Sequence, residues 1–241
     1  MPDPFAQALH DHHFDEQRGP LVQRCGETTR EHDVESYFRV TDVADTDDPE
    51  ADWLGAWLDG PILDMGAGVG RHALAVQEHH ETVAIEQSEP LVAVMRDRGV
   101  ADARVADMFA LRETFERDRF RSALAFGTQV GLAGSTAGLR EFLTDLAYVT
   151  TPDATAVFDG FDPSETATTE LLDYRPDPAP GFGYRVAQFE YDGTLGEPWL
   201  YRLFSPARVR EAVVGTDWAV ADVTYGDGDW SHTYHVALAK R

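Results

Sequence analysis

The sequence predicts an α/β protein with a doubly wound, mainly parallel sheet. Short apolar runs alternate with helical patterns between residues 61 and 160, as in parallel sheets covered by helices. The first apolar run, 61–65, is followed by three glycines at alternate positions, Gly66, Gly68 and Gly70. A helical pattern starts directly after them. A strand, a tight glycine turn and a helix form the usual cradle for a nucleotide-containing ligand, because a Cβ in the turn would collide with the ligand.

The alternation gives the order of the elements. The predicted strands lie near residues 61–65, 82–86, 102–106, 121–126 and 154–160. The predicted helices between them lie near residues 70–79, 89–98, 109–116 and 136–149. Ser88 and Ser135 are suitable N-terminal caps for two of these helices, and Gly99 is a suitable C-terminal stop. The helix caps and stops in the sequence therefore agree with the element boundaries that its apolar periodicity predicts.

The remaining segments extend this core, and we expect a single domain. Residues 1–60 are predicted to be an N-terminal helical segment that can fold over the ligand, with a helix starting near Thr46–Pro49. Residues 61–160 form the ligand-binding core. Residues 161–204 contain two strand-like runs and are predicted to be an inserted β-hairpin near the substrate. Residues 205–241 are predicted to be a closing helix and two antiparallel strands, near 218–224 and 233–239.

The composition is strongly acidic. Asp and Glu number 43 against 20 Lys and Arg, which gives a formal net charge of -23 over 241 residues, and Lys240 is the sole lysine. The acids are spread through the chain and form no block, which favours adaptation to concentrated salt over one cation-binding surface. Nucleic acid is an unexpected substrate, because no stripe of basic and aromatic residues is present.

Several other classes of protein are disfavoured. The single cysteine, Cys25, allows no internal disulfide, and the N-terminus has no secretion signal, so we expect a cytoplasmic protein. No apolar run approaches the roughly 20 residues that span a bilayer. His10, His12 and His13 lie close together, but no distant partner set is evident and we expect no metal site.

Three acidic residues end consecutive predicted strands. Asp64 ends the first strand, Glu86 ends the second and Asp107 ends the third. Because the carboxyl ends of parallel strands line the crevice where open α/β sheets bind ligands, we expect the three carboxylates to face one ligand. Glu86 is then placed to accept two hydrogen bonds from a ribose diol. Each acid taken alone can also be explained as a helix cap or a turn residue.

Two residues distinguish between nucleotide ligands. A dinucleotide fingerprint needs Gly or Ala at its third glycine position for close helix packing, and this chain has Arg71 there. A pyrophosphate is disfavoured beside Asp64, whereas a ligand with an ammonium group and a sulfonium would be stabilised by that carboxylate. S-adenosylmethionine is such a ligand.

These motifs resemble those of the class I S-adenosylmethionine-dependent methyltransferases. The resemblance covers residues 61–160 and implies a Rossmann-like, seven-stranded sheet with an antiparallel last strand. It implies S-adenosylmethionine as the cofactor, with its amino group at Asp64, its ribose at Glu86 and its adenine at Asp107. The positions that the resemblance assigns to the cofactor are Asp64, Gly66, Ala67, Gly68, Gly70, Glu86, Gln87, Asp107, Met108 and Phe126.

The acceptor of the methyl group is not identified by the sequence. The fourth strand lacks the Asn/Asp-Pro-Pro-aromatic run that family members acting on DNA adenine or glutamine usually have, so a small molecule is expected. The substrate candidates are Tyr37, Gln129, Tyr184, Trp199 and Tyr201, and core packing also explains each of the aromatic ones. His232 is a further candidate, and no catalytic base is required. An NAD(P)-dependent oxidoreductase and a non-catalytic S-adenosylmethionine-binding protein remain as alternatives.

Overall fold

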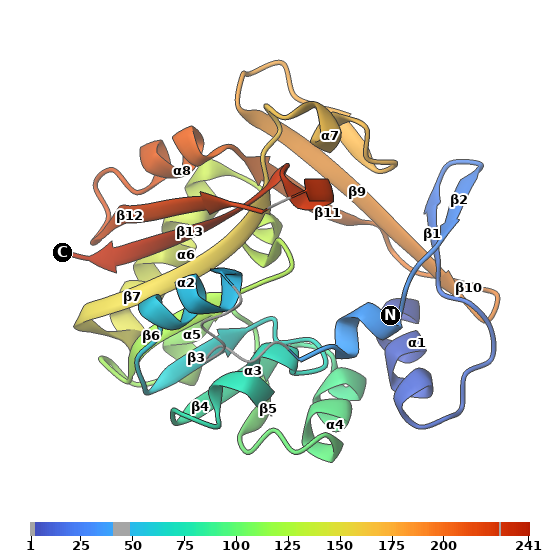
Figure 1. The fold of residues 1–241 in the computed structure, drawn as a ribbon, viewed down its shortest axis with the longest axis horizontal. Coiled ribbons are helices and arrows are strands. Elements are labelled where there is room, and N and C mark those ends of the chain that lie inside the picture. Colours follow the sequence, from blue (N-terminus) through green and yellow to red (C-terminus); the bar gives the residue numbers. More distant parts are fainter. Residues whose placement is uncertain (1–2, 41–48, 227) are drawn as a thin grey trace.

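The computed structural model describes residues 3–40, 49–226 and 228–241, and its largest feature is a seven-stranded sheet (Figure 1). In the order in which they lie across the sheet, the strands are β12 (Trp218–Tyr225), β13 (Thr233–Lys240), β7 (Thr150–Phe161), β6 (Phe120–Ala125), β3 (Ile62–Met65), β4 (Thr82–Glu86) and β5 (Ala103–Val105). The strands from β7 to β5 are parallel to one another, whereas β13 is antiparallel to both of its neighbours. The predicted mainly parallel sheet with an antiparallel last strand is confirmed.

Helices cover both faces of this sheet (Figure 1). One face packs against α2 (Pro49–Trp57), α3 (Arg71–Val76) and α4 (Glu89–Asp97). The other face packs against α5 (Leu111–Thr114), α6 (Thr136–Val149) and α8 (Pro206–Ala212). The alternation of side chains along each strand explains the two cores, because Ile62 and Leu63 point to opposite faces and both are fully buried. The doubly wound prediction is confirmed.

The boundaries of the elements agree with the sequence patterns in most places. Ser135 caps α6 by accepting a hydrogen bond from the Gly138 amide, and α4 starts with Pro90 in its first turn. The helix predicted near 109–116 is reduced to the single turn α5, because Phe115 already has an extended backbone. The predicted helix start at Thr46–Asp48 lies outside the described residues.

A second, antiparallel sheet lies beside the first (Figure 1). Its strands are β1 (Val22–Cys25), β2 (Thr28–Glu31), β8 (Tyr174–Pro176), β9 (Phe182–Tyr191), β10 (Thr194–Leu195) and β11 (Trp199–Phe204), and the short helix α7 (Thr166–Thr169) precedes β8. The pairing of β9 with β11 confirms the predicted hairpin insert. The expectation that residues 1–60 form a helical segment is wrong in part. Residues 22–31 form a hairpin of β1 and β2, and β1 pairs with β9.

The N-terminal segment and the second sheet share a core, and we call residues 4–38 and 174–204 the cap. The helix α1 (Pro4–His13) and the 3-10 turn η1 (Glu35–Phe38) pack against β9, β11 and α4. Leu9 of α1 and Phe189 of β9 lie in one buried cluster with Val69, which belongs to the glycine loop after β3. The cap therefore rests directly on that loop.

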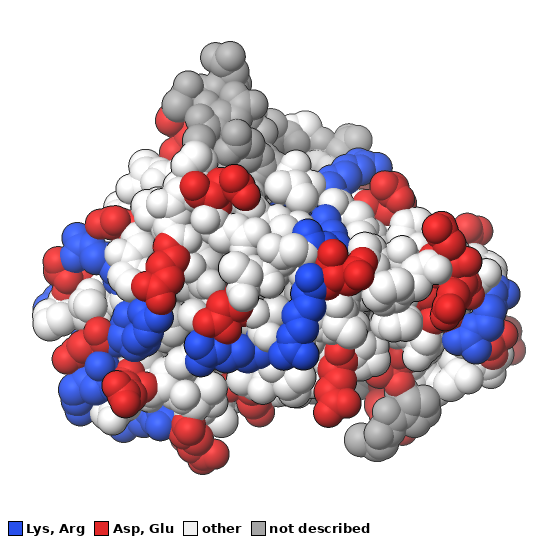
Figure 2. All heavy atoms as spheres, turned by 90° about the horizontal axis from the view of Figure 1, so that it is seen from below, with Lys and Arg blue, Asp and Glu red and all other residues white. Residues whose placement is uncertain are grey.

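The surface carries acids and arginines side by side. Figure 2 shows one face of the molecule, on which Asp and Glu side chains are interspersed with Arg and form no block of one sign. Arg121, for example, pairs with both Asp59 and Asp153 at the surface. Among the described residues, no helix is long and apolar enough to cross a membrane.

Candidate functional site

The glycine loop between β3 and α3 is shaped by three residues with positive φ. The φ angles of Gly66, Gly68 and Gly70 are 65°, 58° and 79°, in a region that favours glycine. A Cβ on Gly70 would lie 2.7 Å from Cγ2 of Val100, so this glycine also permits the loop to pack closely on the side chain of Val100. A Cβ on Gly68 would meet nothing within 4 Å. The backbone at Gly68 is therefore open to a ligand.

Asp64 lies beneath this loop on β3, and its carboxylate is short of partners. Its side chain is 1% exposed and accepts a hydrogen bond from the Ala73 amide, but its Oδ2 atom has no hydrogen-bond partner among the described residues. Burial raises the pKa of Asp64 to about 7, with a smaller opposing effect from Arg71 and a reinforcing one from Glu86. A buried, incompletely bonded carboxylate is stabilised by a cationic or hydrogen-bond-donating ligand.

Glu86, at the end of β4, is joined to the glycine loop. Its Oε2 accepts a hydrogen bond from the Gly68 amide at 3.2 Å, and its Oε1 accepts one from the Ser88 amide at 3.1 Å. Burial raises its pKa, and these backbone donors oppose that rise. Each carboxylate oxygen has further lone pairs, so Glu86 can accept additional hydrogen bonds from a diol. The exposed Gln87 follows it.

The acid at the end of the next strand is arranged differently. Asp107 follows β5 and accepts a hydrogen bond from the Phe109 amide at 2.8 Å through Oδ1, which leaves Oδ2 available. Met108 is 5% exposed, and its side chain packs in the main core with Leu111 and Phe115. The structure thus brings Asp64, Glu86 and Asp107 to the same edge of the sheet, at the ends of three adjacent strands.

The loop after β6 completes this edge. Thr128 has a φ of 63°, unusual for a residue other than glycine, and its amide donates to Asp159 Oδ1 at 2.7 Å. The side chain of Gln129 lies against the glycine loop, since a Cβ on Gly66 would be 2.7 Å from Gln129 Cδ. The side chain of Gln129 makes no hydrogen bond within the described part of the chain, so both ends of its carboxamide are available to a ligand. Phe126 is 8% exposed and its ring contacts His72.

Arg71, the first residue of α3, has a free guanidinium. It makes no hydrogen bond and no ion pair with any residue that the structure describes. It nevertheless lies close enough to Asp64, Asp159 and Tyr37 to oppose the rise that burial causes in the pKa of each. A positive charge without an ion-pair partner at this edge is suited to bind a carboxylate.

Of the four aromatic residues that the sequence suggested as substrate contacts, two lie near the edge of the sheet. The Tyr37 hydroxyl lies 2.5 Å from Nε2 of His32, and burial raises the pKa of Tyr37 to about 12. Burial also raises the pKa of Tyr201, which lies close to Tyr37 and Glu86. Tyr201 of the cap therefore lies near Glu86 at the sheet edge, and Tyr37 lies near Arg71.

The two other aromatic candidates lie elsewhere in the cap. Trp199 packs with Phe5 and Phe189 in the core of the cap, and its ring centroid is 6.3 Å from that of Tyr201. Tyr184 points to the opposite face of the second sheet, where its ring lies beneath the guanidinium of Arg202.

His232, the further candidate, is 7% exposed, and its Nδ1 has no hydrogen-bond partner within the described parts of the chain.

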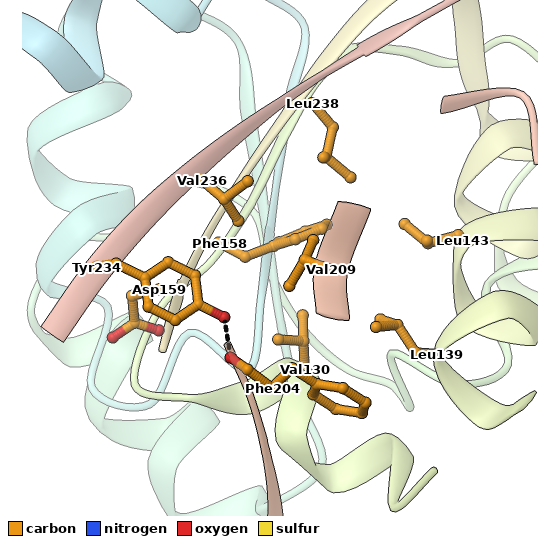
Figure 3. A pocket seen from close by; sticks show the side chains of 10 residues that line it. All are labelled: Val130, Leu139, Leu143, Phe158, Asp159, Phe204, Val209, Tyr234, Val236 and Leu238. Carbon is orange, nitrogen blue, oxygen red and sulfur yellow. Dashed lines mark hydrogen bonds between the residues drawn. The ribbon is translucent and has the colours of Figure 1, made fainter. Parts of the chain in front are cut away.

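A small internal cavity lies behind the edge of the sheet (Figure 3). Its volume is about 10 Å³, which is at the lower limit for one water molecule. The cavity is lined mainly by apolar side chains such as Leu139, Leu143 and Leu238, and the Asp159 carboxylate points away from these leucines (Figure 3). A cavity of this size and lining cannot hold a nucleotide, so it belongs to the core.

Three side chains at the edge were not singled out by the sequence analysis as ligands or substrate contacts. Asp159 lies two residues before the end of β7, close to the strand end as Asp64 and Glu86 are, so the strand-end criterion could have identified it. Arg71 argues against a dinucleotide, but an arginine directly after a glycine loop is also a signal for a group that binds an anion. His72 lies on the buried side of α3, and burial holds its pKa well below the usual range.

The histidines near the N-terminus form pairs with acids. His12 contacts Glu35, and His13 contacts Asp97 at 2.8 Å. Within residues 3–40, 49–226 and 228–241, no three His, Cys, Asp or Glu side chains are grouped in a way that could hold a metal ion. Cys25 lies 2.7 Å from Nη2 of Arg175.

Comparisons with known proteins agree with this geometry. No protein-family profile matches the sequence, and neither does any curated protein. Among solved structures, a methyltransferase from Bacteroides fragilis in complex with S-adenosyl-L-homocysteine has a TM-score of 0.75 at 23% identity, over 100% of this chain and 97% of that one. The CcbJ methyltransferase from Streptomyces caelestis has a TM-score of 0.59 at 15% identity, over 79% of this chain and 88% of that one.

An archaeal structure gives the same result. A methyltransferase from Methanosarcina mazei has a TM-score of 0.59 at 12% identity, over 78% of this chain and 96% of that one. The strand order and the helices on both faces of the sheet therefore define an α/β protein of the doubly wound class. Its fold is that of the class I S-adenosylmethionine-dependent methyltransferases.

Proposed function

We propose that the protein is an S-adenosylmethionine-dependent methyltransferase that acts on a small-molecule acceptor. The observation that carries this proposal is Asp64, a buried carboxylate with an unbonded Oδ2 beneath a glycine loop that is open at Gly68. A cofactor with an ammonium group would supply the missing hydrogen bonds to Asp64, and a pyrophosphate would be repelled there. The chain's own residues thus fit this cofactor better than a dinucleotide.

Arg71 and Glu86 extend the fit to the rest of the cofactor. The free guanidinium of Arg71 is suited to the carboxylate of the cofactor's amino-acid part, and Glu86 is suited to its ribose hydroxyls. Asp107 and Gln87 are placed along the edge for the adenine. Gly66, Ala67, Gly70, Met108 and Phe126 shape the surface beneath the cofactor. Residues 61–160 are then the cofactor-binding core, and residues 1–60 and 161–204 the substrate side.

The chemistry that this cofactor supplies when bound is an activated methyl group on a sulfonium, which leaves as a neutral thioether. The chain contributes alignment and exclusion of water. The cap rests on the glycine loop through Val69, with Tyr201 near Glu86 and Tyr37 near Arg71. Alignment of two reactants can lower a barrier by about 7–11 kcal/mol, so no nucleophilic side chain is required.

Cofactor binding is tested by titration of the purified protein with S-adenosylhomocysteine and with NADH in concentrated KCl. We expect the wild type to bind S-adenosylhomocysteine and not NADH. Glu86→Ala should weaken that binding by roughly ten- to a hundredfold, or about 1.5–3 kcal/mol, because two charge-assisted hydrogen bonds are lost. Glu116→Ala, a change at an exposed acid far from the loop, is the matched control. Equal affinity of the Glu86→Ala and control variants would overturn the assignment of Glu86.

Catalysis is tested separately from binding. Cofactor labelled in its methyl group is incubated with the protein and with fractionated metabolites, and the fraction that gains the label is identified. Transfer to a metabolite fraction is the expected result. Binding of S-adenosylhomocysteine without transfer to any fraction would favour a non-catalytic cofactor-binding protein instead.

A further inference from the structure

Asp159 lies at the same sheet edge as the proposed cofactor site, on the face that carries Asp64. The register aligns Asp64 of β3 with Leu124 of β6, and Leu124 with Val157 of β7. Asp159 lies two residues after Val157, so it shares that face. It is placed two strands away from Asp64, beside the end of β6, and a molecule bound there would lie next to one held at the glycine loop.

The position of the Asp159 carboxylate is fixed by backbone donors. The amides of Gly127 and Thr128 both donate to it, the latter at 2.7 Å. Burial raises its pKa, and the opposing charges that face it among the described residues are His235 of β13 and Arg71 of α3. The carboxylate points away from the apolar cavity behind it (Figure 3). Asp159 is therefore a rigid acceptor of hydrogen bonds whose ionised form would be stabilised by a cation.

A series of aromatic rings lies on the face of the sheet that Asp159 shares, on the side of α2 and α3. The ring centroid of Phe126 is 4.7 Å from that of His72 and 5.2 Å from that of His235, and Trp53 lies 5.9 Å from His235. Burial holds the pKa of His72 well below its usual range, so this imidazole is neutral at pH 7. Aromatic faces next to a carboxylate are suited to bind an ammonium group.

The distribution of positive charge in the site points in the same direction. Arg185, the other guanidinium close to Tyr37, is already paired with Asp173 at 3.0 Å, and Asp173 is 1% exposed. Arg71 is assigned above to the cofactor's own carboxylate. Neither of these two guanidinium groups would then be available to an anionic acceptor, whereas a cationic one would find Asp159.

We infer, on the basis of the proposed function, that the methyl acceptor carries a protonated amine and that this ammonium group binds between the Asp159 carboxylate and the ring of Phe126. The free carboxamide of Gln129 lies on the neighbouring loop and offers a further hydrogen-bond acceptor to the amine. The substrate class is therefore small amines, and acids of similar size are rejected.

The test compares three probes of nearly equal shape: benzylamine, which is protonated at neutral pH, benzyl alcohol and benzoate. Each is titrated calorimetrically into wild-type protein that is saturated with S-adenosylhomocysteine. We expect benzylamine to bind at least about tenfold more tightly than the other two. Asp159→Asn, which keeps an oxygen acceptor for the Thr128 amide, should remove this preference. Asp153→Asn makes the same change at the other end of β7 and should keep it.

The outcomes separate the two proposals. Failure of wild-type protein to bind S-adenosylhomocysteine would overturn the proposed function. Binding of S-adenosylhomocysteine with equal affinity for the three probes, or with a preference for benzoate, would overturn the amine inference alone. The wild-type comparison is decisive even if Asp159→Asn does not fold, and a folded Asp159→Asn protein that retains the preference would show that the ammonium group binds elsewhere.

Discussion

At the scale of the residue, Asp64 shows a conflict between stability and binding. Its carboxylate is buried with an unbonded oxygen, and burial raises its pKa to about 7. In the unfolded chain the same group ionises near 3.8. Between these values the folded protein holds a proton that the unfolded chain has lost, so the free energy of unfolding falls as the pH rises from about 4 to about 7. Above that range the loss is complete.

Asp64→Asn removes this titration, and its effect can be measured directly. We expect the variant to unfold at a higher temperature than the wild type at pH 8, with a difference that disappears near pH 4. The upper limit of the gain is roughly 4 kcal/mol, from a pKa difference of about three units. Affinity for S-adenosylhomocysteine should fall at the same time. Glu116→Gln serves as the control for loss of an exposed charge, and a variant less stable than wild type at pH 8 would contradict the prediction.

At the scale of the element, Arg98 joins three parts of the chain. It lies just after α4, and its guanidinium donates to the carbonyl of Val69 in the glycine loop at 2.5 Å and to the carbonyl of Phe38 in η1 at 2.8 Å. It also lies over the ring of Phe38, 5.0 Å from its centroid. The conformation of the glycine loop is thereby linked to the position of the cap.

Arg98→Ala should loosen the cap and weaken cofactor binding together. We expect a loss of about 1–3 kcal/mol in unfolding free energy, because bonds from a charged donor are removed at a partly buried site. Hydrogen exchange should become faster at the amides of residues 34–38, and affinity for S-adenosylhomocysteine should fall. Arg96→Ala is the matched control, since Arg96 is on the same helix but binds the Ala103 carbonyl. Equal exchange rates at 34–38 in the two variants would disprove the link.

The elements that could be predicted from the sequence are those with strong local signals. An apolar run marks the strand that ends at Glu86, and the cap Ser135 marks the start of α6. The hairpin of β1 and β2 has no such signal, because all four residues of β2 are exposed and its neighbour β1 pairs with a strand far along the chain. The role of Arg98 could not be predicted either, because its two hydrogen-bond acceptors are backbone carbonyls, which no sequence pattern specifies.

At the scale of the whole molecule, the dominant quantity is the net charge of -23. Acids of one sign repel one another across the surface, and ion pairs such as that of Arg104 with Asp102 neutralise only part of the excess. Salt shortens the range of this repulsion from about 30 Å at 0.01 M to about 3 Å at 1 M. The folded protein brings the acids closer together than the unfolded chain does, so it gains more from screening.

We therefore expect the unfolding temperature to rise when KCl is increased from about 0.01 M to about 1 M. Scanning calorimetry at constant pH measures the change, and sucrose at matched osmolality controls for effects on water that do not involve charge. An unfolding temperature that is unchanged or lower in KCl would show that the surface ion pairs outweigh the repulsion between acids.

The pairing of β1 with β9 has a consequence for how the chain is made. Val22 leaves the ribosome long before its partner Glu190 exists, while the strands from β3 to β7 find their neighbours within a much shorter stretch of the nascent polypeptide. The five parallel strands of the central sheet can thus assemble during translation, whereas β1 stays without its partner strand until β9 has emerged. The beginning of the chain is among the last parts to find its place.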